Sequence, residues 1–180
     1  MRKPIAFWLL AFLVGLFGAL AVFSPVKAKA NLIPLTHDCL KDAAKLFQIP
    51  PEIVLAILAT EGGKVGEVSF NPSGSFDLGP MQINSTWLPI LSDRGIRLEH
   101  IRDNGCANVA VGAWILRLNF LETKNMTRAL AYYHSRDPRK GRAYVVATML
   151  KAKTLDLNQT LAKANGADAA QSRAKVSQAQ

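Results

Sequence analysis

The stretch PPEIVLAILATEGG, residues 50–63, carries the strongest structural signal in the chain. Proline stands at its start, Glu52 follows in the first turn, and an unbroken apolar run leads to two glycines at the exit. Proline in the first turn and glycine just after the last turn are typical of helix ends. We therefore predict a buried helix over residues 51–61.

A carboxyl group ends this apolar helix. Glu61 lies four residues after Ile57 and three after Leu58, so its side chain projects from the face that the helix buries. Burial and the negative end of the helix dipole both disfavour a charged carboxylate, which predicts a raised pKa. A carboxylic acid that stays protonated near neutral pH can act as a general acid. The alternative is a frayed helix end with Glu61 in solvent.

The remaining periodic segments predict a mainly helical fold. An amphipathic helix is expected over residues 36–48, with Thr36 or Asp38 as its N-cap. Further helices are expected over 105–121, after Thr127 as N-cap, and around 142–152, where Val145, Val146, Met149 and Leu150 share one face. Glycine, serine and Asn-Pro favour a loop or short irregular hairpin over residues 62–77, and a short helix is expected after Gly79 that breaks at Pro89.

The first 30 residues have the layout of a secretory signal peptide. A basic tip precedes an apolar run over residues 5–23, and Pro25 and the small-residue sequence AKA at 28–30 follow. The run is also long enough to span a bilayer, so a retained N-terminal membrane anchor is the alternative. In both cases we expect the rest of the chain to be periplasmic, with membrane contact only through residues 5–23 if they are retained.

Residues 153–180 contain no aromatic side chain and are rich in Ala, Gln, Lys and Asn. Such a composition buries too little apolar surface to join a core, so we expect a flexible polar tail that is at most partly helical. A partner-binding helix is the alternative.

Basic residues outnumber acidic ones, 22 to 13. Residues 1–30 hold four basic residues and no acidic ones, so the remainder has eighteen basic residues against thirteen acidic, a formal charge of +5. This charge suits an anionic polymer such as a cell wall, although a mildly basic surface explains it equally well. The sequence has no long Lys/Arg run and no interleaving of basic and aromatic residues, so we expect no nucleic-acid partner.

The chain has two cysteines, Cys39 and Cys106. In an oxidising compartment they most simply form one disulfide, and two separately buried thiols are the alternative. They lack C-x-x-C spacing, and the three histidines do not form an H-E-x-x-H pattern. We therefore expect no metal site and no cofactor.

Side chains suited to a sugar gather in residues 71–87. Amides, hydroxyls and large apolar groups occur together there: Asn71, Gln82 and Asn84; Ser73, Ser75 and Ser85; Phe76, Met81 and Trp87. Sugar hydroxyl and acetamido groups need convergent amides, whereas the faces of the sugar pack on apolar side chains. The composition is therefore compatible with a carbohydrate site beside Glu61.

Three motifs, in order along residues 37–151, resemble one known family. ILATEGG ends the buried helix, Asn71-Pro72 and GPMQIN at 79–84 follow, and ALAYYHS at 129–135 provides a later tyrosine motif. The chain thus resembles the lytic transglycosylases of the soluble-lytic-transglycosylase, lysozyme-like type, and looks most like the small members that accompany conjugation, type IV pilus and type III secretion machines. The resemblance implies a mainly α, lysozyme-like α+β fold. A single catalytic domain over 36–152 would have a long loop or small hairpin lining a sugar-binding cleft.

The resemblance also implies roles for individual residues. Glu61 would be the sole acid/base, and the two cysteines are expected to pair. Met81, Gln82 and Asn84 would line the sugar cleft. Tyr133 would support the carboxylate or the scissile sugar.

Two positions depart from the family pattern. Gly62 stands where a serine usually follows the catalytic Glu, so the role of that hydroxyl is either missing here or supplied by another residue such as Ser73 or Ser75. His134 stands where Asn commonly follows the tyrosine. It would be either a substrate-binding residue or a surface histidine at a helix end.

The implied reaction cleaves peptidoglycan between N-acetylmuramic acid and N-acetylglucosamine without water and leaves 1,6-anhydro ends, opening the wall for an envelope-spanning machine. Glycosidases usually need two carboxylates, and Asp77 is the nearest second candidate. If Asp77 activated water, the protein would be a hydrolytic muramidase, whereas its other expected role is to cap the turn before Gly79. A non-catalytic peptidoglycan-binding assembly factor is a further alternative.

Overall fold

The computed structural model describes residues 31–167, and the predicted signal peptide or anchor over 1–30 lies outside them. The described residues form eight α-helices, one 3-10 helix and a small sheet. The helices are α1 (His37–Phe47), α2 (Pro51–Glu61), η1 (Ser85–Trp87), α3 (Leu88–Ser92), α4 (Leu98–Asp103), α5 (Gly105–Thr123), α6 (Met126–His134), α7 (Pro138–Ala152) and α8 (Leu157–Ala164). The strands are β1 (Val68–Phe70), β2 (Phe76–Leu78) and β3 (Ile83–Asn84). The predicted mainly helical fold with a small hairpin is confirmed.

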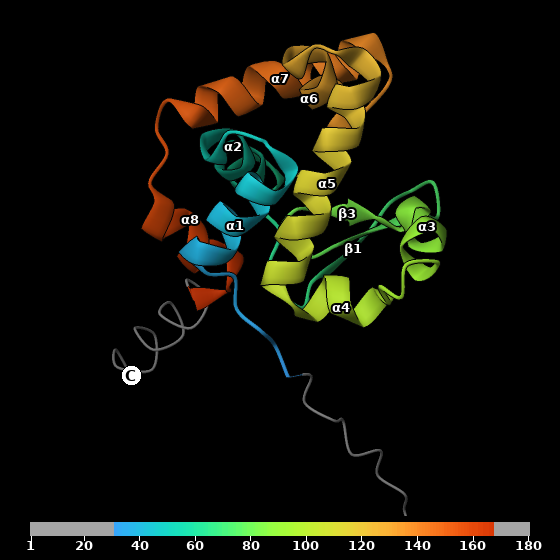
Figure 1. Cartoon of the computed structure of the whole chain (residues 1–180), viewed down its shortest axis with the longest axis vertical. Helices are drawn as coiled ribbons and strands as arrows, with labels where there is room; N and C mark the ends of the chain where they lie inside the picture. Colours follow the sequence, from blue (N-terminus) through green and yellow to red (C-terminus); the bar gives the residue numbers. More distant parts are fainter. Residues whose placement is uncertain (1–30, 168–180) are drawn as a thin grey trace, which may run out of the picture.

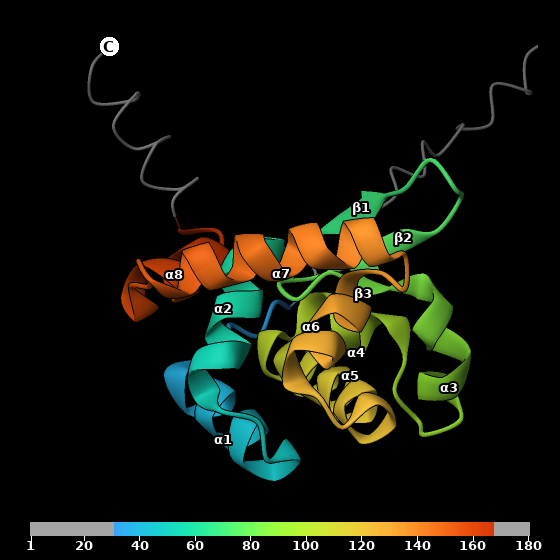
Figure 2. The same ribbon diagram turned by 90° about the horizontal axis from the view of Figure 1, so that it is seen from above.

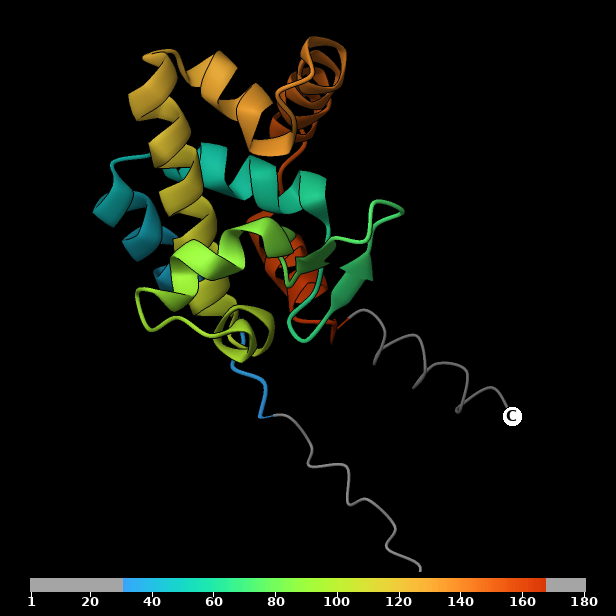
Figure 3. The same ribbon diagram turned by 90° about the vertical axis from the view of Figure 1, so that its right-hand side faces the viewer.

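Helix α2 is the central element of the fold, with the bounds that the sequence predicts. It contacts α1, α5, α7 and α8, so it has no wide polar face (Figure 1). Pro51 begins it, and Gly62 ends it with φ of 64°, a left-handed conformation that glycine adopts without steric cost. The end of this helix points toward the hairpin (Figure 3). The carboxyl of Glu61 is thereby held at the junction of the helices and the sheet.

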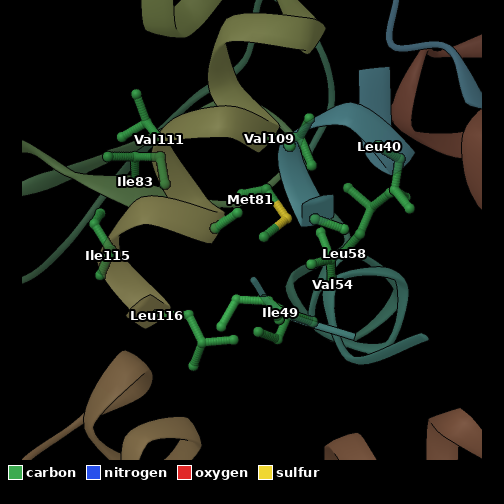
Figure 4. Close-up of a cluster of buried hydrophobic side chains, with 14 of the residues drawn as sticks. Leu40, Ile49, Val54, Leu58, Met81, Ile83, Val109, Val111, Ile115 and Leu116 are labelled. Atoms are coloured by element: carbon green, nitrogen blue, oxygen red, sulfur yellow. The ribbon is translucent and has the colours of Figure 1, made fainter. Parts of the chain in front are cut away.

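The hydrophobic core fills the space between α2 and the long helix α5. Val54 and Leu58 of α2 meet Val109 and Leu116 of α5 in one cluster of buried side chains (Figure 4). Leu40, Ile49, Met81, Ile83, Val111 and Ile115 belong to the same cluster. Burying one aliphatic side chain contributes roughly 1.5–3 kcal/mol, so this cluster fixes the direction in which α2 ends.

The three short strands form an antiparallel sheet in the order β1-β2-β3. Val68 pairs with Leu78 and Phe70 with Phe76, while Asp77 lies opposite Asn84. The hairpin extends beyond the helices at the N-terminal end of α7 (Figure 2). The prediction that Pro89 breaks a helix beginning after Gly79 is wrong. Pro89 lies in the first turn of α3, where a missing N–H is tolerated.

Cys39 and Cys106 form a disulfide that joins the first turns of α1 and α5, which confirms the predicted pair. Their Cα atoms are 5.2 Å apart, and 67 residues separate them in sequence. The chain-entropy model assigns a loop of this length on the order of 4 kcal/mol of stabilisation. The bridge therefore fastens α1 to the helix that carries the other half of the core.

The starts of α6 and α7 differ from the prediction. Asn125, not Thr127, caps α6 by accepting a hydrogen bond from the Arg128 N–H. Helix α7 begins at Pro138, where Asp137 accepts from the N–H groups of the next turn. Its buried face carries Gly141, Tyr144 and Thr148, whereas Val146, Met149 and Leu150 are exposed. The helix therefore buries the opposite side from the one that its aliphatic residues suggested.

The predicted flexible tail is wrong for residues 157–164, which form α8 against α2. Ala164 is buried, and its carbonyl accepts a hydrogen bond from the Val65 N–H. The Asn165 side chain accepts from the Leu35 N–H and donates to the Leu35 carbonyl, at 2.7 and 2.8 Å. A few small apolar contacts and this pair of hydrogen bonds hold the segment, a combination that composition does not reveal. Residues 168–180 of the expected tail lie outside the described residues.

Within residues 31–167 no single helix has both the length and the hydropathy needed to cross a membrane. Helices α1 and α2 meet these criteria only together, and they are bent by 120° at the break between them.

Replacing Asn165 by alanine is expected to lower the free energy of unfolding by about 1–2 kcal/mol, because the buried Leu35 amide loses its hydrogen-bond partners. Urea unfolding followed by circular dichroism measures the change. Asn158→Ala, an exposed asparagine on α8, is the matched control and should change stability by less than about 0.5 kcal/mol. Equal stability of the Asn165→Ala variant and wild type would show that α8 is not anchored in this way.

Candidate active site

A cleft of about 740 Å³ opens where the end of α2 meets the hairpin and the end of α6. Glu61 lines it together with five of the predicted site residues: Ser75, Gln82, Asn84, Tyr133 and His134. The predictions that these side chains converge on one cavity with Glu61 therefore agree with the structure. Met81 is the exception.

The Glu61 carboxyl has a strongly perturbed pKa. Its pKa is raised from 4.5 to about 7, chiefly because burial removes water from the charged form. The hydrogen bond from Tyr144 acts in the opposite direction and lowers the pKa, whereas the nearby negative charge of Asp77 raises it. Near neutral pH the group is divided between acid and carboxylate, as an acid/base catalyst requires.

Tyr144 of α7 is the site residue that the sequence analysis missed. Its hydroxyl donates a hydrogen bond to Oε1 of Glu61 at 2.6 Å, and only 6% of the residue is exposed. Burial raises the pKa of its phenol well above the usual range, so it remains a neutral donor. Gly141 and Thr148 lie one helical turn before and after Tyr144. These small neighbours leave room for the ring to turn inward, and they are the only sequence signal that Tyr144 is buried.

The ring of His134 lies flat against Tyr144, with centroids 4.7 Å apart and planes 2° from parallel. Tyr133 stacks on the same ring from 6.5 Å. His134 is the exposed last residue of α6 and also lines the cleft, so substrate binding by His134 stays a prediction. These contacts restrict the rotation of Tyr144 and aim its hydroxyl at the carboxyl.

Tyr133 does not hydrogen-bond to the carboxylate. Its hydroxyl donates to the main-chain carbonyl of Met81 at 3.0 Å. Burial, followed by the charge of Glu61, raises the pKa of its phenol well above the normal value, so it too remains protonated. Tyr133 therefore fixes the GPMQIN segment from one side and leaves the support of Glu61 to Tyr144.

The prediction that Met81 lines the sugar cleft is wrong, because the side chain is fully buried in the core (Figure 4). Successive side chains of residues 81–84 point to opposite sides, although only Ile83 and Asn84 are in a strand and Met81 and Gln82 lie in the turn before it. Met81 and Ile83 point into the core, whereas Gln82 and Asn84 point into the cleft.

Buried Asn108 of α5 fixes the register of this alternation. Its Oδ1 accepts from the Met81 N–H at 2.7 Å, and its Nδ2 donates to the carbonyls of Leu78 and Ile101 at 2.8 and 3.0 Å. One side chain thus satisfies three buried backbone groups, which would otherwise each cost about 1–3 kcal/mol. No local sequence signal indicates this role, since Asn108 lies within an apolar helical pattern.

Gly63, which follows the C-cap residue Gly62, brings the end of α2 close to Gly79 and Gln82 in the cleft wall. A Cβ atom on Gly63 would lie 2.3 Å from the Gly79 carbonyl oxygen and 2.4 Å from Nε2 of Gln82. Gln82 itself has φ of 47° and donates from Nε2 to that same carbonyl at 2.9 Å. Only glycine at position 63 allows this close approach.

A hydrogen-bond network orders the other wall. Asp77 accepts from Nδ2 of Asn71 at 2.8 Å and from Nδ2 of Asn84 at 2.7 Å, one bond to each carboxylate oxygen. Ser75 accepts from the same two amides and lies 3.1 Å from the Ser73 hydroxyl. The expected role of Asp77 as a cap of the turn before Gly79 is therefore wrong. Its carboxylate instead links the side-chain amides of Asn71 and Asn84 across the hairpin.

The hydroxyl that the family places after the catalytic Glu has no counterpart at Gly62, whose left-handed conformation closes α2. Ser73 and Ser75 both line the cleft opposite. Ser135 lines the cleft as well. That Ser73 or Ser75 supplies the missing hydroxyl to a ligand stays a prediction.

The sequence profile of the family described as "Transglycosylase SLT domain" matches residues 38–152. The chain belongs to this family. The resemblance carried by the three motifs is therefore confirmed, together with the lysozyme-like fold that it implied.

Several relatives of this SLT chain are similar over part or most of their length. Invasion protein IagB of Salmonella typhimurium (strain SL1344) is 41% identical over 80 residues, which cover 44% of this chain and 50% of that protein. The chain thus spans about half the length of the IagB proteins that it matches. A "Peptidoglycan-binding-like protein" of Escherichia coli O157:H7 is 32% identical over 143 residues, 69% of this chain and 84% of that protein. "X polypeptide" of Escherichia coli (strain K12) is 28% identical over 106 residues, 58% of this chain and 63% of that protein.

No group of three or more histidine, cysteine or acidic side chains able to hold a metal ion occurs in the part of the SLT chain that the structure describes.

Tyr144→Phe is expected to raise the pKa of Glu61 above its wild-type value of about 7, because the variant lacks the hydrogen bond that stabilises the carboxylate. Carboxyl ¹³C NMR titration measures it, and the signal missing from Glu61→Gln assigns the resonance. Tyr132→Phe, in the same cleft but without a hydrogen bond to Glu61, should leave the pKa unchanged. An unchanged or lowered pKa in Tyr144→Phe would contradict this geometry.

Proposed function

We propose that this protein is a peptidoglycan lytic transglycosylase. It cleaves the β-1,4 bond between N-acetylmuramic acid and N-acetylglucosamine and leaves 1,6-anhydro ends. The observation that carries the proposal is the Glu61 carboxyl in the cleft, which has a pKa of about 7 and a fixed hydroxyl partner. Membership in the SLT family agrees with this activity.

The first step needs a proton at the glycosidic oxygen. Tyr144 occupies Oε1 of Glu61, so Oε2 is the oxygen that donates the proton to the departing sugar. As the bond from muramyl C1 to that oxygen breaks, positive charge develops at C1. The acetamido group of the same sugar stabilises this charge from within the substrate.

The second step returns the proton. Glu61, now a carboxylate, accepts the proton of the muramyl C6 hydroxyl, and the C6 oxygen bonds to C1 to close the 1,6-anhydro ring. The hydrogen bond from Tyr144 stabilises the carboxylate between the two steps. One group thus serves as acid and then as base, the catalyst is regenerated, and no water enters the product.

The amide and hydroxyl groups of the opposite wall suit the substrate's acetamido and hydroxyl groups. Gln82 lies in the turn just before β3, Asn84 lies in β3, and Ser73 and Ser75 come from the hairpin tip. Asn84 donates to Ser75, Ser73 and Ser75 share a hydrogen bond, and Gln82 donates to the Gly79 carbonyl. These bonds hold the side chains in place before a sugar binds, which lowers the entropic cost of binding.

Hydrolysis assisted by Asp77 is the competing reaction, since its charge acts on Glu61 from across the cleft. Both oxygens of Asp77 already accept amide hydrogen bonds, so it is better placed to orient Asn71 and Asn84 than to activate water. The two reactions leave different ends on the glycan.

We further propose that the protein is exported through residues 1–30, acts in the periplasm, and opens the wall locally for a secretion, conjugation or pilus machine. The signal-like sequence, the positive charge of the remainder and the word "Invasion" in the names of the IagB relatives support this role. Components of such a machine would be its protein partners.

Glu61→Gln is expected to reduce the release of soluble fragments from purified sacculi by at least about 100-fold, because the variant has no proton to donate and no base to accept one. Mass spectrometry of wild-type products should show ends one water lighter than reducing ends. Glu52→Gln, an exposed glutamate in the first turn of α2, is the matched control and should cleave as fast as wild type.

Residual activity of Glu61→Gln within about tenfold of wild type would rule out the proposed acid/base. Reducing ends in the wild-type products would instead establish a hydrolytic muramidase. Binding of sacculi without any cleavage would identify a non-catalytic peptidoglycan-binding protein.

A further inference from the structure

A second cavity, of about 710 Å³, adjoins the cleft of Glu61. Its lining residues come from α6, the N-terminal half of α7 and the turn that joins them. Tyr132, Ser135 and Arg136 line both the cleft and this cavity. A ligand bound at Glu61 can therefore continue into the second cavity without leaving the surface.

The wall between the two cavities is well fixed. Arg136 forms two hydrogen bonds with the carboxylate of Glu122, both 2.7 Å, and its guanidinium lies 4.6 Å above the Tyr132 ring. Both carboxylate oxygens of Glu122 are thus occupied, and the charge of Arg136 is neutralised. The one acid of the cavity, Asp137, is held by the N–H groups of Arg139 and Lys140 at the start of α7.

Two cations remain unneutralised. Arg128 of α6 and Arg142 of α7 line the cavity, and neither forms an ion pair with any residue in the range 31–167. Both side chains are exposed, and Lys140 adds a third positive charge on the cleft side of the turn. The cavity is thus a positively charged extension of a sugar cleft, which is the setting for an anionic substituent of the glycan.

We propose that this cavity binds the acidic peptide stem carried by the muramyl residue next to the cleaved bond, with Arg128 and Arg142 facing its carboxylates. The inference rests on the proposed function, because it takes peptidoglycan as the ligand of the cleft. In that polymer each muramyl residue carries a lactyl group to which a short peptide with free carboxylates is attached.

Arginine is suited to this role because its planar guanidinium donates two parallel hydrogen bonds to one carboxylate. The two side chains are exposed, so each contributes modestly and the contribution is weakened by salt. They recognise the stem and do not contact the atoms that react at Glu61. The structure therefore assigns preference for peptide-bearing over naked glycan to a site separate from the acid/base.

The test measures binding in the full chain carrying Glu61→Gln, so that the glycan stays intact. The two probes are a muramyl-containing tetrasaccharide with its peptide stems and the same tetrasaccharide after an amidase has removed them. We expect the peptide-bearing form to bind about tenfold more tightly by isothermal titration calorimetry at low salt. Adding Arg128→Gln and Arg142→Gln should reduce this preference to within about twofold and leave the affinity for the peptide-free form unchanged.

The matched control adds Arg139→Gln and Lys153→Gln, two exposed cations that remove the same charge near α7 but do not line the cavity. This control should keep the tenfold preference. Equal affinity of the parent for both probes, an undiminished preference in the Arg128/Arg142 variant, or an equal loss in the control would each overturn the proposal.

Cleavage and stem recognition fail separately in this design. Absence of anhydro products from the active protein would refute the proposed reaction and would leave the binding ratio as a valid measure of stem recognition. Failure of the peptide-bearing probe to bind would overturn the stem site even if sacculi were cleaved.

Discussion

The burial of one carboxyl group at the end of a core helix is the constraint on which the site depends. Helices α1, α5, α7 and α8 surround α2, so its last side chain loses water and keeps its proton toward neutral pH. Helix α7, which packs against α2, also supplies the Tyr144 hydroxyl, whose hydrogen bond reduces the energetic cost of ionising Glu61. The tight turn through Gly62 and Gly63 then returns the chain along the cleft wall. An acid that can both give and take a proton therefore arises from packing around one helix.

The opposite wall of the cleft, residues 78–84, is held in place by the buried side-chain amide of Asn108. Asn108 holds the backbone on both sides of Gly79 and, with Tyr133, fixes both main-chain polar groups of Met81. Core packing of Met81 and hydrogen bonding of its backbone determine which side chains of the segment turn outward. Gln82 and Asn84 thus reach the cleft because their neighbours are committed to the core. Mutations in this segment are expected to affect fold and site together.

Local signals were sufficient to predict what lies within one helix or one motif. Proline, glycine and an apolar run define α2 and place Glu61 on its buried face. The presence of only two cysteines in the sequence was enough to predict the disulfide. Contacts between distant segments were not predictable from one sequence. Tyr144 meets Glu61 across 83 residues, and the aliphatic residues of α7 suggested the wrong buried face. Helix α8 was missed because Asn165 and backbone hydrogen bonds, more than apolar area, hold it in place.

Folding places the Glu61 carboxyl where its ionisation is costly. The raised pKa means that the folded chain binds the proton more tightly than the unfolded chain, so stability falls as pH rises from 4.5 through about 7. The most direct measurement compares the urea unfolding free energies of wild type and Glu61→Gln at about pH 4 and about pH 8. We predict that the variant gains stability relative to wild type by on the order of 3 kcal/mol between these conditions. A difference between the two proteins that does not change with pH would contradict the account.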